Sequence, residues 1–353
     1  MLLRGRLNIM DSQTLLSQPR FQPPKDWDWG FRSFDGMKIR YGLPRSRKSY
    51  NGVVTIIGGL GDFGEQYFEL ANECEAKNLK PIIIDMPGQG GSSRYLPETT
   101  MRRHSLGFDV ALSQLHTVID EIVLSAAIDI EDNHKRLPIF LMAHSMGGHM
   151  ALRTLAEYNQ SSRGEKIFSA AFLSAPMLGI KAVSQFPEWL RSVILRLLAL
   201  RPTAYVPGGG DWFDGYRERI GFKGIFSSDP ERYEIQRTYF THPDYKFLVT
   251  GSPTNKWLLD AYLSCKKIEK SGYLEKINIP VFIGIAGDDR LVDNSYSYAA
   301  AKRLPNGKII DIPNSQHEIL MEADQYRTPF VQEFFTFIKD NVLNKHNQSK
   351  TYI

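Results

Sequence analysis

The sequence predicts an α/β protein built on a mostly parallel sheet that helices cover on both faces. Short apolar runs typical of buried strands alternate with longer segments of helical periodicity, and this alternation favours parallel strands joined by crossover helices. The chain has 353 residues, of which 42% are hydrophobic, so it can bury one large core. Two cysteines give no disulfide framework, which favours a reducing compartment.

The alternation begins after a predicted antiparallel edge near residues 30–42, which turns at Asp35-Gly36. Six core strands are expected at 52–57, 81–85, 138–143, 169–174, 280–286 and 308–312. The helices are expected at 65–78, 105–127, 146–159, 294–304 and 325–343.

One interval interrupts this order. Residues 176–265 are helical in pattern, contain Pro and Gly breaks, and are too many for a loop between two core strands. We therefore predict a helical cap, or lid, inserted after the strand 169–174, which is the sixth strand when the two edge strands are counted. The full division is an irregular N-terminal extension (1–25), a core (26–175 and 266–345), the cap (176–265) and a tail (346–353).

Ser145 lies between the apolar run Ile139–Ala143 and a helical pattern that begins at Met146. Small residues stand two positions before and after it, at Ala143 and Gly147. This is the G-x-S-x-G nucleophile elbow with alanine in the first place, a sharp turn that exposes a serine hydroxyl above the sheet. The pentapeptide alone is equally consistent with a helix N-cap, so the rest of the chain must decide.

A serine nucleophile needs a base and an acid that orients the base. In this architecture the acid and then the histidine follow later strands. His317 follows the strand 308–312 and is the predicted base, whereas His144 and His149 precede any acid loop.

The predicted acid is Asp289, in the loop that follows the strand 280–286. Two neighbours compete with it. We expect Asp293 to cap the helix 294–304 and Asp288 to face solvent at the end of the strand.

An oxyanion hole requires two backbone N–H groups. One is expected from Met146, directly after the serine, and the other from Leu60 in the glycine-rich loop after the first core strand. The alternative is an ordinary glycine-rich turn. A phosphate-binding loop is disfavoured because G-x-G-x-x-G is missing. The second glycine-rich turn, residues 85–93, is expected to be a structural turn beside the active site.

Four motifs together resemble one family: A-H-S-M-G-G at the elbow, D-M-P-G-Q-G-G-S, G-D-D-R-L-V-D-N and Q-H-E-I-L-M-E. They resemble the bacterial lysophospholipases and monoacylglycerol lipases, whose domain is labelled serine aminopeptidase-like, and in particular the lysophospholipases associated with the inner membrane. The resemblance covers about residues 30–340. The chain departs from it at Ala143 and at Gly58-Gly59, where the family has Gly and His-Gly.

The resemblance implies an α/β-hydrolase fold and a serine hydrolase that cleaves lysophospholipid to a fatty acid and a glycerophospho-alcohol through an acyl-enzyme. The alternatives are a monoacylglycerol lipase or a general carboxylesterase. Two further classes are a short-peptide aminopeptidase and a non-catalytic receptor. An aminopeptidase would need carboxylates in the cap, for which Glu218, Asp229 and Glu231 are candidates.

A predicted cap helix over residues 186–200 carries a broad apolar face, with Pro187 at its first position. Trp189, Val193 and Leu197 on this face are the predicted substrate-binding residues. They would line an acyl-chain groove or dip into a membrane surface. The simpler alternative is that the face packs on the core.

The remaining features limit the partners. No apolar run reaches the length of a membrane span, and Met1–Arg20 does not read as a signal peptide. The net charge of +4 is compatible with an anionic surface. We find no nucleic-acid motif and no Cys/His metal cluster, and the chemistry needs no cofactor or metal. We therefore expect a cytoplasmic protein that contacts a lipid substrate and, peripherally, the inner face of the membrane.

Overall fold

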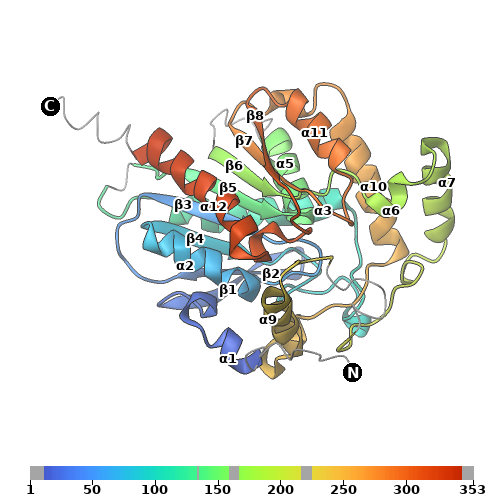
Figure 1. The fold of residues 1–353 in the computed structure, drawn as a ribbon, viewed down its shortest axis with the longest axis horizontal. Helices are drawn as coiled ribbons and strands as arrows, with labels where there is room; N and C mark the ends of the chain where they lie inside the picture. The colour runs from blue at the N-terminus through green and yellow to red at the C-terminus, as the bar shows by residue number, and fades with distance from the viewer. Residues whose placement is uncertain (1–11, 133–134, 159–166, 216–224, 344–353) are drawn as a thin grey trace, which may run out of the picture.

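The computed structural model describes residues 12–132, 135–158, 167–215 and 225–343, and its centre is an eight-stranded sheet (Figure 1). The strand order is β1-β2-β4-β3-β5-β6-β7-β8. The strands are β1 (Trp27–Phe34), β2 (Met37–Pro44), β3 (Gly52–Ile57), β4 (Leu79–Ile84), β5 (Ile139–His144), β6 (Phe168–Ser174), β7 (Val281–Ala286) and β8 (Gly307–Ile312).

The first two strands form the antiparallel edge that the sequence predicts. They pair through the two-residue turn Asp35-Gly36, whose φ angles of 49° and 77° suit a tight hairpin turn. β2 also pairs with β4 antiparallel, and β3 to β8 are parallel to one another. The carboxyl ends of β3, β5, β7 and β8 therefore meet at one edge of the sheet.

Alternating side chains along the strands divide the core into two layers. Along β5, Ile139, Leu141 and Ala143 face one layer, and Phe140 and Met142 face the other. The first layer is covered by α3 (Phe108–Val118), α5 (Met146–Tyr158), α10 (Asn255–Glu269) and α11 (Asn294–Arg303). The second is covered by α2 (Phe68–Ala76) and α12 (Asp324–Ile338) (Figure 1). This doubly covered sheet is the predicted fold class.

The described parts of the segment between β6 and β7, residues 175–215 and 225–280, are rich in helices. They contain α6 (Lys181–Ser184), α7 (Glu188–Leu198), α9 (Pro230–Thr241), the short η5 (Pro243–Leu248) and α10. The predicted boundary at residue 265 divides α10. Trp257 and Ala261 of this helix belong to the core layer beside α3 and α5, so the core resumes at α10 and not after it.

One local expectation needs correction, and the N-terminal extension has regular structure in its described part. Pro187 precedes α7 with extended backbone, so it is the N-cap and not the first helical residue. The described part of the N-terminal extension is ordered: residues 12–16 form α1, and Leu15 and Phe21 are buried against α9. The extension therefore covers part of the helical insertion.

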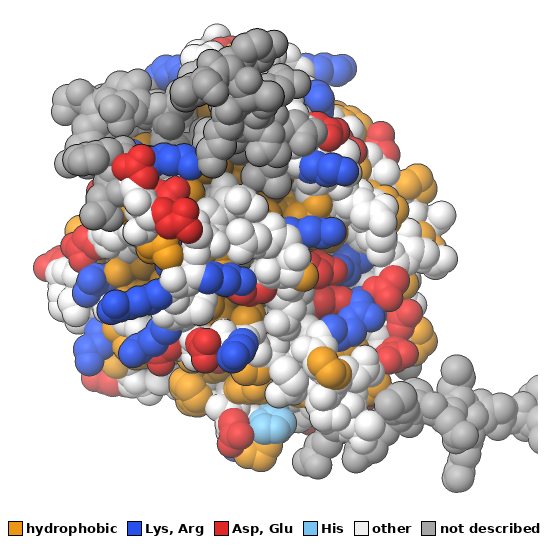
Figure 2. All heavy atoms as spheres, turned by 90° about the vertical axis from the view of Figure 1, so that its left-hand side faces the viewer, with side chains coloured by type: hydrophobic (Ala, Val, Ile, Leu, Met, Phe, Trp, Pro, Cys, Tyr) orange, Lys and Arg blue, Asp and Glu red, His pale blue; other side chains and the backbone are white. Residues whose placement is uncertain are grey.

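Helix α7 stands at the periphery, at the right-hand edge of Figure 1. It is fixed to the rest of the molecule through Leu195, which packs with Val183 and with Tyr262 of α10. On the opposite side of the molecule, acidic and basic side chains are interspersed, with hydrophobic side chains scattered between them (Figure 2). On α7 itself, three large hydrophobic side chains are exposed: Trp189, Val193 and Leu197.

Candidate active site

The turn at Ser145 is the sharpest feature of the site. β5 ends at His144 and α5 begins at Met146, so Ser145 alone makes the connection, with φ of 50°. Such a left-handed conformation is strained for a residue other than glycine and persists only where surrounding contacts enforce it. Here the Ser145 N–H donates to Ser174 O at 2.9 Å, and the Ser145 carbonyl accepts from the N–H groups of His149 and Met177.

Gly147 lets the helix approach the sheet. A Cβ atom at this position would lie 2.4 Å from Ile57 O and 2.5 Å from Gly58 O, closer than non-bonded atoms tolerate. By contrast, Ala143, which replaces the first glycine of the motif, is fully buried within β5 and pairs with Ile57. The extra methyl group is accommodated there.

The structure brings the three predicted catalytic side chains into one hydrogen-bonded chain. His317 Nε2 lies 2.9 Å from Ser145 Oγ, and His317 Nδ1 lies 2.6 Å from Asp289 Oδ2. All three residues are buried. They come from the ends of β5, β7 and β8, which lie at one edge because these strands are parallel. The histidine is thus placed to take a proton from the serine.

Asp289 is fixed as an anion that faces the imidazole. Its second oxygen accepts the N–H groups of Leu291 and Val292 at 2.8 and 2.9 Å. Burial acts to raise the pKa of Asp289, but the charge and hydrogen bond of His317, with these N–H groups, lower it overall. The carboxylate therefore stays ionised across the neutral range.

The two competing aspartates lie where the sequence suggests. Asp293 is the N-cap of α11 and accepts the N–H of Ser295 at 3.1 Å. Asp288 is exposed. The aspartate whose carboxylate faces His317 Nδ1 is Asp289.

The glycine-rich loop after β3 is held by a residue that the sequence analysis did not single out. Gln89, from the second glycine-rich turn, donates through Nε2 to Gly59 O at 2.6 Å and accepts the Gly61 N–H at 2.9 Å. In a trans peptide the carbonyl and the N–H point in opposite directions. Gln89 therefore turns the N–H of Leu60 away from itself.

Leu60 and Met146, the two predicted oxyanion donors, line the same pocket. Its other apolar walls come from α3, α5 and α10, including Phe108, Met150 and Trp257. The pocket is a narrow recess of about 20 Å³, and its wall includes Met146, the residue directly after the serine.

Arg103 stands at the rim of this pocket. Its guanidinium donates to Leu60 O at 2.8 Å and to Gly251 O. It therefore joins the glycine-rich loop to the helical segment between β6 and β7.

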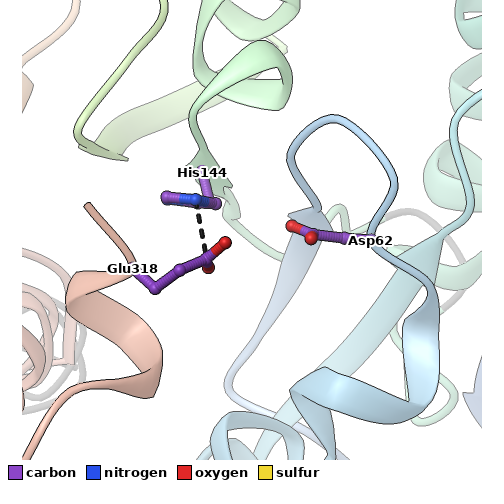
Figure 3. Close-up of side chains that lie close together, drawn as sticks. All are labelled: Asp62, His144 and Glu318. Carbon is purple, nitrogen blue, oxygen red and sulfur yellow. Dashed lines mark ion pairs between the residues drawn. The ribbon is translucent and has the colours of Figure 1, made fainter. Parts of the chain in front are cut away.

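A second cluster of buried ionisable groups, which sequence reasoning missed, lies behind the serine and histidine. Ligand-type atoms of Asp62, His144 and Glu318 lie within 4.8 Å of one another (Figure 3). His144 Nε2 is 3.1 Å from Glu318 Oε2, and the His144 and His317 rings are 4.8 Å apart. The three residues are far apart in sequence, so only the adjacency of their motifs to the serine and histidine hinted at the cluster.

The three predicted substrate-binding residues of α7 are exposed and lie outside the lining of the pocket. Trp189 is 74% exposed, Val193 49% and Leu197 62%. Packing against the core instead uses Leu195. The simpler alternative, in which the apolar face packs on the core, is therefore wrong for these three residues.

The candidate amine-binding carboxylates do not form a cluster in the described residues. Asp229 is the N-cap of α9 and accepts the N–H groups of Glu231 and Arg232. Glu231 is exposed, and Glu218 lies outside the described residues.

A buried serine–histidine–aspartate chain at the carboxyl edge of a doubly covered parallel sheet defines the class of α/β-hydrolases. Residues 48–324 match the family model described as serine aminopeptidase, S33. This chain belongs to that family, as its motifs predicted.

Curated relatives and solved structures agree with this assignment. The chain is 25% identical to lysophospholipase L2 of Escherichia coli K12 over 328 residues, which covers 90% of this chain and 87% of the relative. It is 27% identical to human monoglyceride lipase over 124 residues, 35% of this chain and 36% of the relative. A soluble variant of monoglyceride lipase from Saccharomyces cerevisiae, in complex with a substrate analog, has a TM-score of 0.68 at 18% identity, covering 89% of this chain and 95% of that one.

The close approach of α5 to β3 gives a test of the elbow. Gly147→Ala should force the helix away from the Ile57 and Gly58 carbonyls, because neither backbone group can yield to a methyl group. Overpacking of this kind costs about 1–3 kcal/mol of unfolding free energy. We expect a lower midpoint in denaturant unfolding and a weaker reaction with a serine-directed fluorophosphonate.

The matched control is Gly210→Ala, because a Cβ atom there meets no heavy atom within 4 Å. Equal behaviour of the two variants in both measurements would contradict the steric argument.

Proposed function

We propose that this protein is a serine hydrolase that cleaves the carboxylic ester of single-chain lipids, with lysophospholipid as its substrate. The observation that carries the proposal is the unbroken chain from Asp289 through His317 to Ser145, with contacts of 2.6 and 2.9 Å. Membership of the serine aminopeptidase, S33 family and the lipid-hydrolase relatives support it.

The reaction follows from these positions. Ser145 Oγ attacks the ester carbonyl carbon while His317 Nε2 accepts the hydroxyl proton. The N–H groups of Leu60 and Met146 donate to the oxygen that becomes negatively charged. The imidazolium, held by Asp289, then gives its proton to the departing glycerol oxygen.

The acyl-enzyme that remains is cleaved by water along the same route. His317 takes a proton from water, the hydroxide oxygen adds to the acyl carbon, and the proton returns to Ser145 Oγ as the fatty acid leaves. The overall reaction consumes only ester and water, and the protons move between side chains of this protein, water and the substrate.

Two features support a lipid substrate. The narrow pocket that Leu60 and Met146 line has largely apolar walls, the kind of surface that an acyl chain requires. In addition, Trp189, Val193 and Leu197 leave an apolar stripe exposed on the peripheral α7, with Arg191 and Arg196 on the same helix. No helix among the described residues is long and apolar enough to cross a membrane.

We propose that α7 lies on the membrane surface while the protein takes a lipid from it.

The choice of lysophospholipid over other single-chain esters depends on the head group, which the catalytic residues themselves do not select. A monoacylglycerol lipase or a general carboxylesterase would use the same serine and histidine, and human monoglyceride lipase is among the relatives. An aminopeptidase receives less support, because Asp229 is engaged in capping α9.

One experiment separates these classes. Purified protein and its Ser145→Ala variant are treated with a fluorophosphonate probe and assayed on a lysophospholipid, a monoacylglycerol of equal chain length and an aminoacyl amide. We expect labelling only when Ser145 is present, fastest turnover of the lysophospholipid, and a loss of several powers of ten in the variant.

Near-normal turnover by purified Ser145→Ala would refute the assignment of the nucleophile. Preference for monoacylglycerol or for the amide would identify one of the other two enzymes, and an unlabelled, inactive wild type would indicate a receptor.

The choice of acid predicts different effects at two neighbouring positions. Asp289→Asn should lower kcat by about 10⁴-fold, because the amide cannot hold the required histidine tautomer. Asp293→Asn keeps a side-chain oxygen that can cap α11, so it should change stability and activity only slightly. Steady-state kinetics of the two variants make the comparison, and an inactive Asp293→Asn with an active Asp289→Asn would reverse the assignment.

The exposed stripe on α7 predicts a selective loss. Val193→Asp and Leu197→Asp should slow turnover of long-chain substrate in anionic vesicles but spare a short, water-soluble ester, because a charge opposes insertion of the helix. Wild-type activity should also rise with acyl length, since each buried CH₂ contributes about 0.8 kcal/mol.

Phe31→Asp is the matched control, because Phe31 is also exposed but lies on the edge strand β1. Equal losses on both substrates with a lower melting temperature would mean that α7 has only a structural role.

A further inference from the structure

The buried cluster of Asp62, His144 and Glu318 joins the three loops that the proposed reaction needs (Figure 3). Asp62 lies in the glycine-rich loop after β3. His144 is the last residue of β5 and directly precedes Ser145. Glu318 directly follows His317. Each loop therefore supplies one member of the cluster next to its own reacting group.

The contacts of the His144 ring indicate where its protons are. Nδ1 lies 3.1 Å from Ser174 O, a carbonyl that can only accept, and 3.2 Å from Ser174 Oγ. A bare Nδ1 would set its lone pair against this carbonyl, so Nδ1 carries a hydrogen. On the other side, Nε2 lies 3.1 Å from Glu318 Oε2, an ion-pair distance, although the direction of its N–H misses this oxygen and the two groups form no hydrogen bond. A bare Nε2 would place its lone pair next to a carboxylate, so it also carries a hydrogen.

We propose that His144 is held as an imidazolium between Glu318 and Asp62, and that this buried charge is the positioning element that aligns Ser145, His317 and the Leu60 N–H. The alignment part rests on the proposed function. The protonation part does not depend on it.

The hydrogen-bond partners of the cluster also hold the backbone of the reacting groups or of the residues next to them. Ser174 O, which accepts from His144 Nδ1, also accepts the Ser145 N–H at 2.9 Å. Asp62 Oδ2 accepts the Gly59 N–H at 2.6 Å and Tyr67 Oη–H at 2.7 Å, which fixes the loop just before Leu60.

The surrounding charges explain how a fully buried imidazole keeps its proton. Burial by itself lowers the pKa of His144, but Glu318, then Asp62 and Asp289, raise it to about 9. For Asp62, burial and the charge of Glu318 raise the pKa and His144 opposes them. Without the imidazolium, two buried carboxylates would face each other, which neither tolerates as an anion.

The other ionisable groups near His144 are its ring neighbour His317 and, through Asp62, the phenol of Tyr67. Burial and Asp62 hold the Tyr67 pKa far above its usual value, so this phenol is neutral. Two carboxylates and an imidazole are also a donor set for a divalent cation. In this site, however, one Asp62 oxygen already accepts two hydrogen bonds, and a proton on Nε2 supplies the positive charge that pairs with Glu318.

The protonation state is directly measurable in the full-length protein with histidine ring-¹⁵N labelling. The His144→Gln variant identifies the resonance of His144 by its loss. We expect both ring nitrogens of His144 to be protonated at pH 7.5 and the ring to titrate near pH 9. In Glu318→Gln the same titration should move to lower pH. A neutral His144 at pH 7.5, or stoichiometric metal in the purified protein, would overturn the proposal.

The alignment is tested by kinetics on the short soluble ester. Glu318→Gln should lower kcat by about 10²-fold, the loss typical of a small misplacement of reacting groups, with little change in KM. Because the imidazolium is lost as pH rises through its pKa, the alkaline limb of kcat should move to lower pH in this variant.

Glu322→Gln is the matched control. Glu322 is also a buried carboxylate in the loop after His317, but it accepts from Gln316 N, Ser228 N and the Ser227 hydroxyl and does not contact His144. It should lower stability without moving the alkaline limb. If the alkaline limb of kcat falls at the same pH in the wild type and in both variants, Glu318 has only a structural role. If the wild type hydrolyses no ester, the proposed function fails, while the NMR titration still decides the protonation of His144.

Discussion

The distance between α5 and β3 is the constraint on which the site depends. Gly147 sits against the carbonyls of Ile57 and Gly58 so closely that no side chain fits between helix and strand. This approach forces the whole change from strand to helix onto Ser145, whose φ of 50° is strained. Hydrogen bonds to the N–H and the carbonyl of Ser145 stabilise this strained conformation. As a result the serine hydroxyl is carried above the sheet, within 2.9 Å of the histidine.

Parallel strands then bring distant segments to the same edge. The carboxyl ends of four strands, β3, β5, β7 and β8, lie at the edge of the sheet that carries the serine. The loops that follow these strands are therefore close enough to contact one another. Loops placed in this way are held by side chains as well as by the sheet. Gln89 orients the glycine-rich loop, and Asp62, His144 and Glu318 join that loop to the elbow and the histidine loop. Buried charges of this kind are costly unless they are paired, which ties the geometry of each loop to that of the others.

The helical segment between β6 and β7 follows a different logic. α10 is part of the core, α9 is covered by the ordered residues that precede β1, and α7 projects to the periphery. This helix is attached through Leu195, through the Glu188–Lys266 ion pair and through Arg191, and it leaves Trp189, Val193 and Leu197 exposed. This arrangement separates a rigid centre for the chemistry from a peripheral apolar surface that is suited to a lipid interface.

The sequence by itself predicted the class of fold, the positions of the strands along the chain and the serine, histidine and aspartate that the structure brings together. It could do so because these depend on local signals: short continuous apolar runs, small residues around Ser145, and a fixed chain order of acid and histidine after strands. Local signals also assigned Asp293 to a helix cap, since capping involves residues only two positions away. The oxyanion assignment of Leu60 and Met146 stays a prediction, although both residues line one pocket.

Only the tertiary structure decided which residues far apart in the chain meet. The start of α7 after Pro187, the assignment of α10 to the core and the ordered residues 12–21 all depend on packing partners that periodicity does not reveal. The cluster of Asp62, His144 and Glu318 is the clearest case. Its members are separated by 82 and 174 positions, and each looks unremarkable in its own segment. They become one charged unit because parallel strands end at a common edge and the interior excludes the water that would otherwise separate their charges.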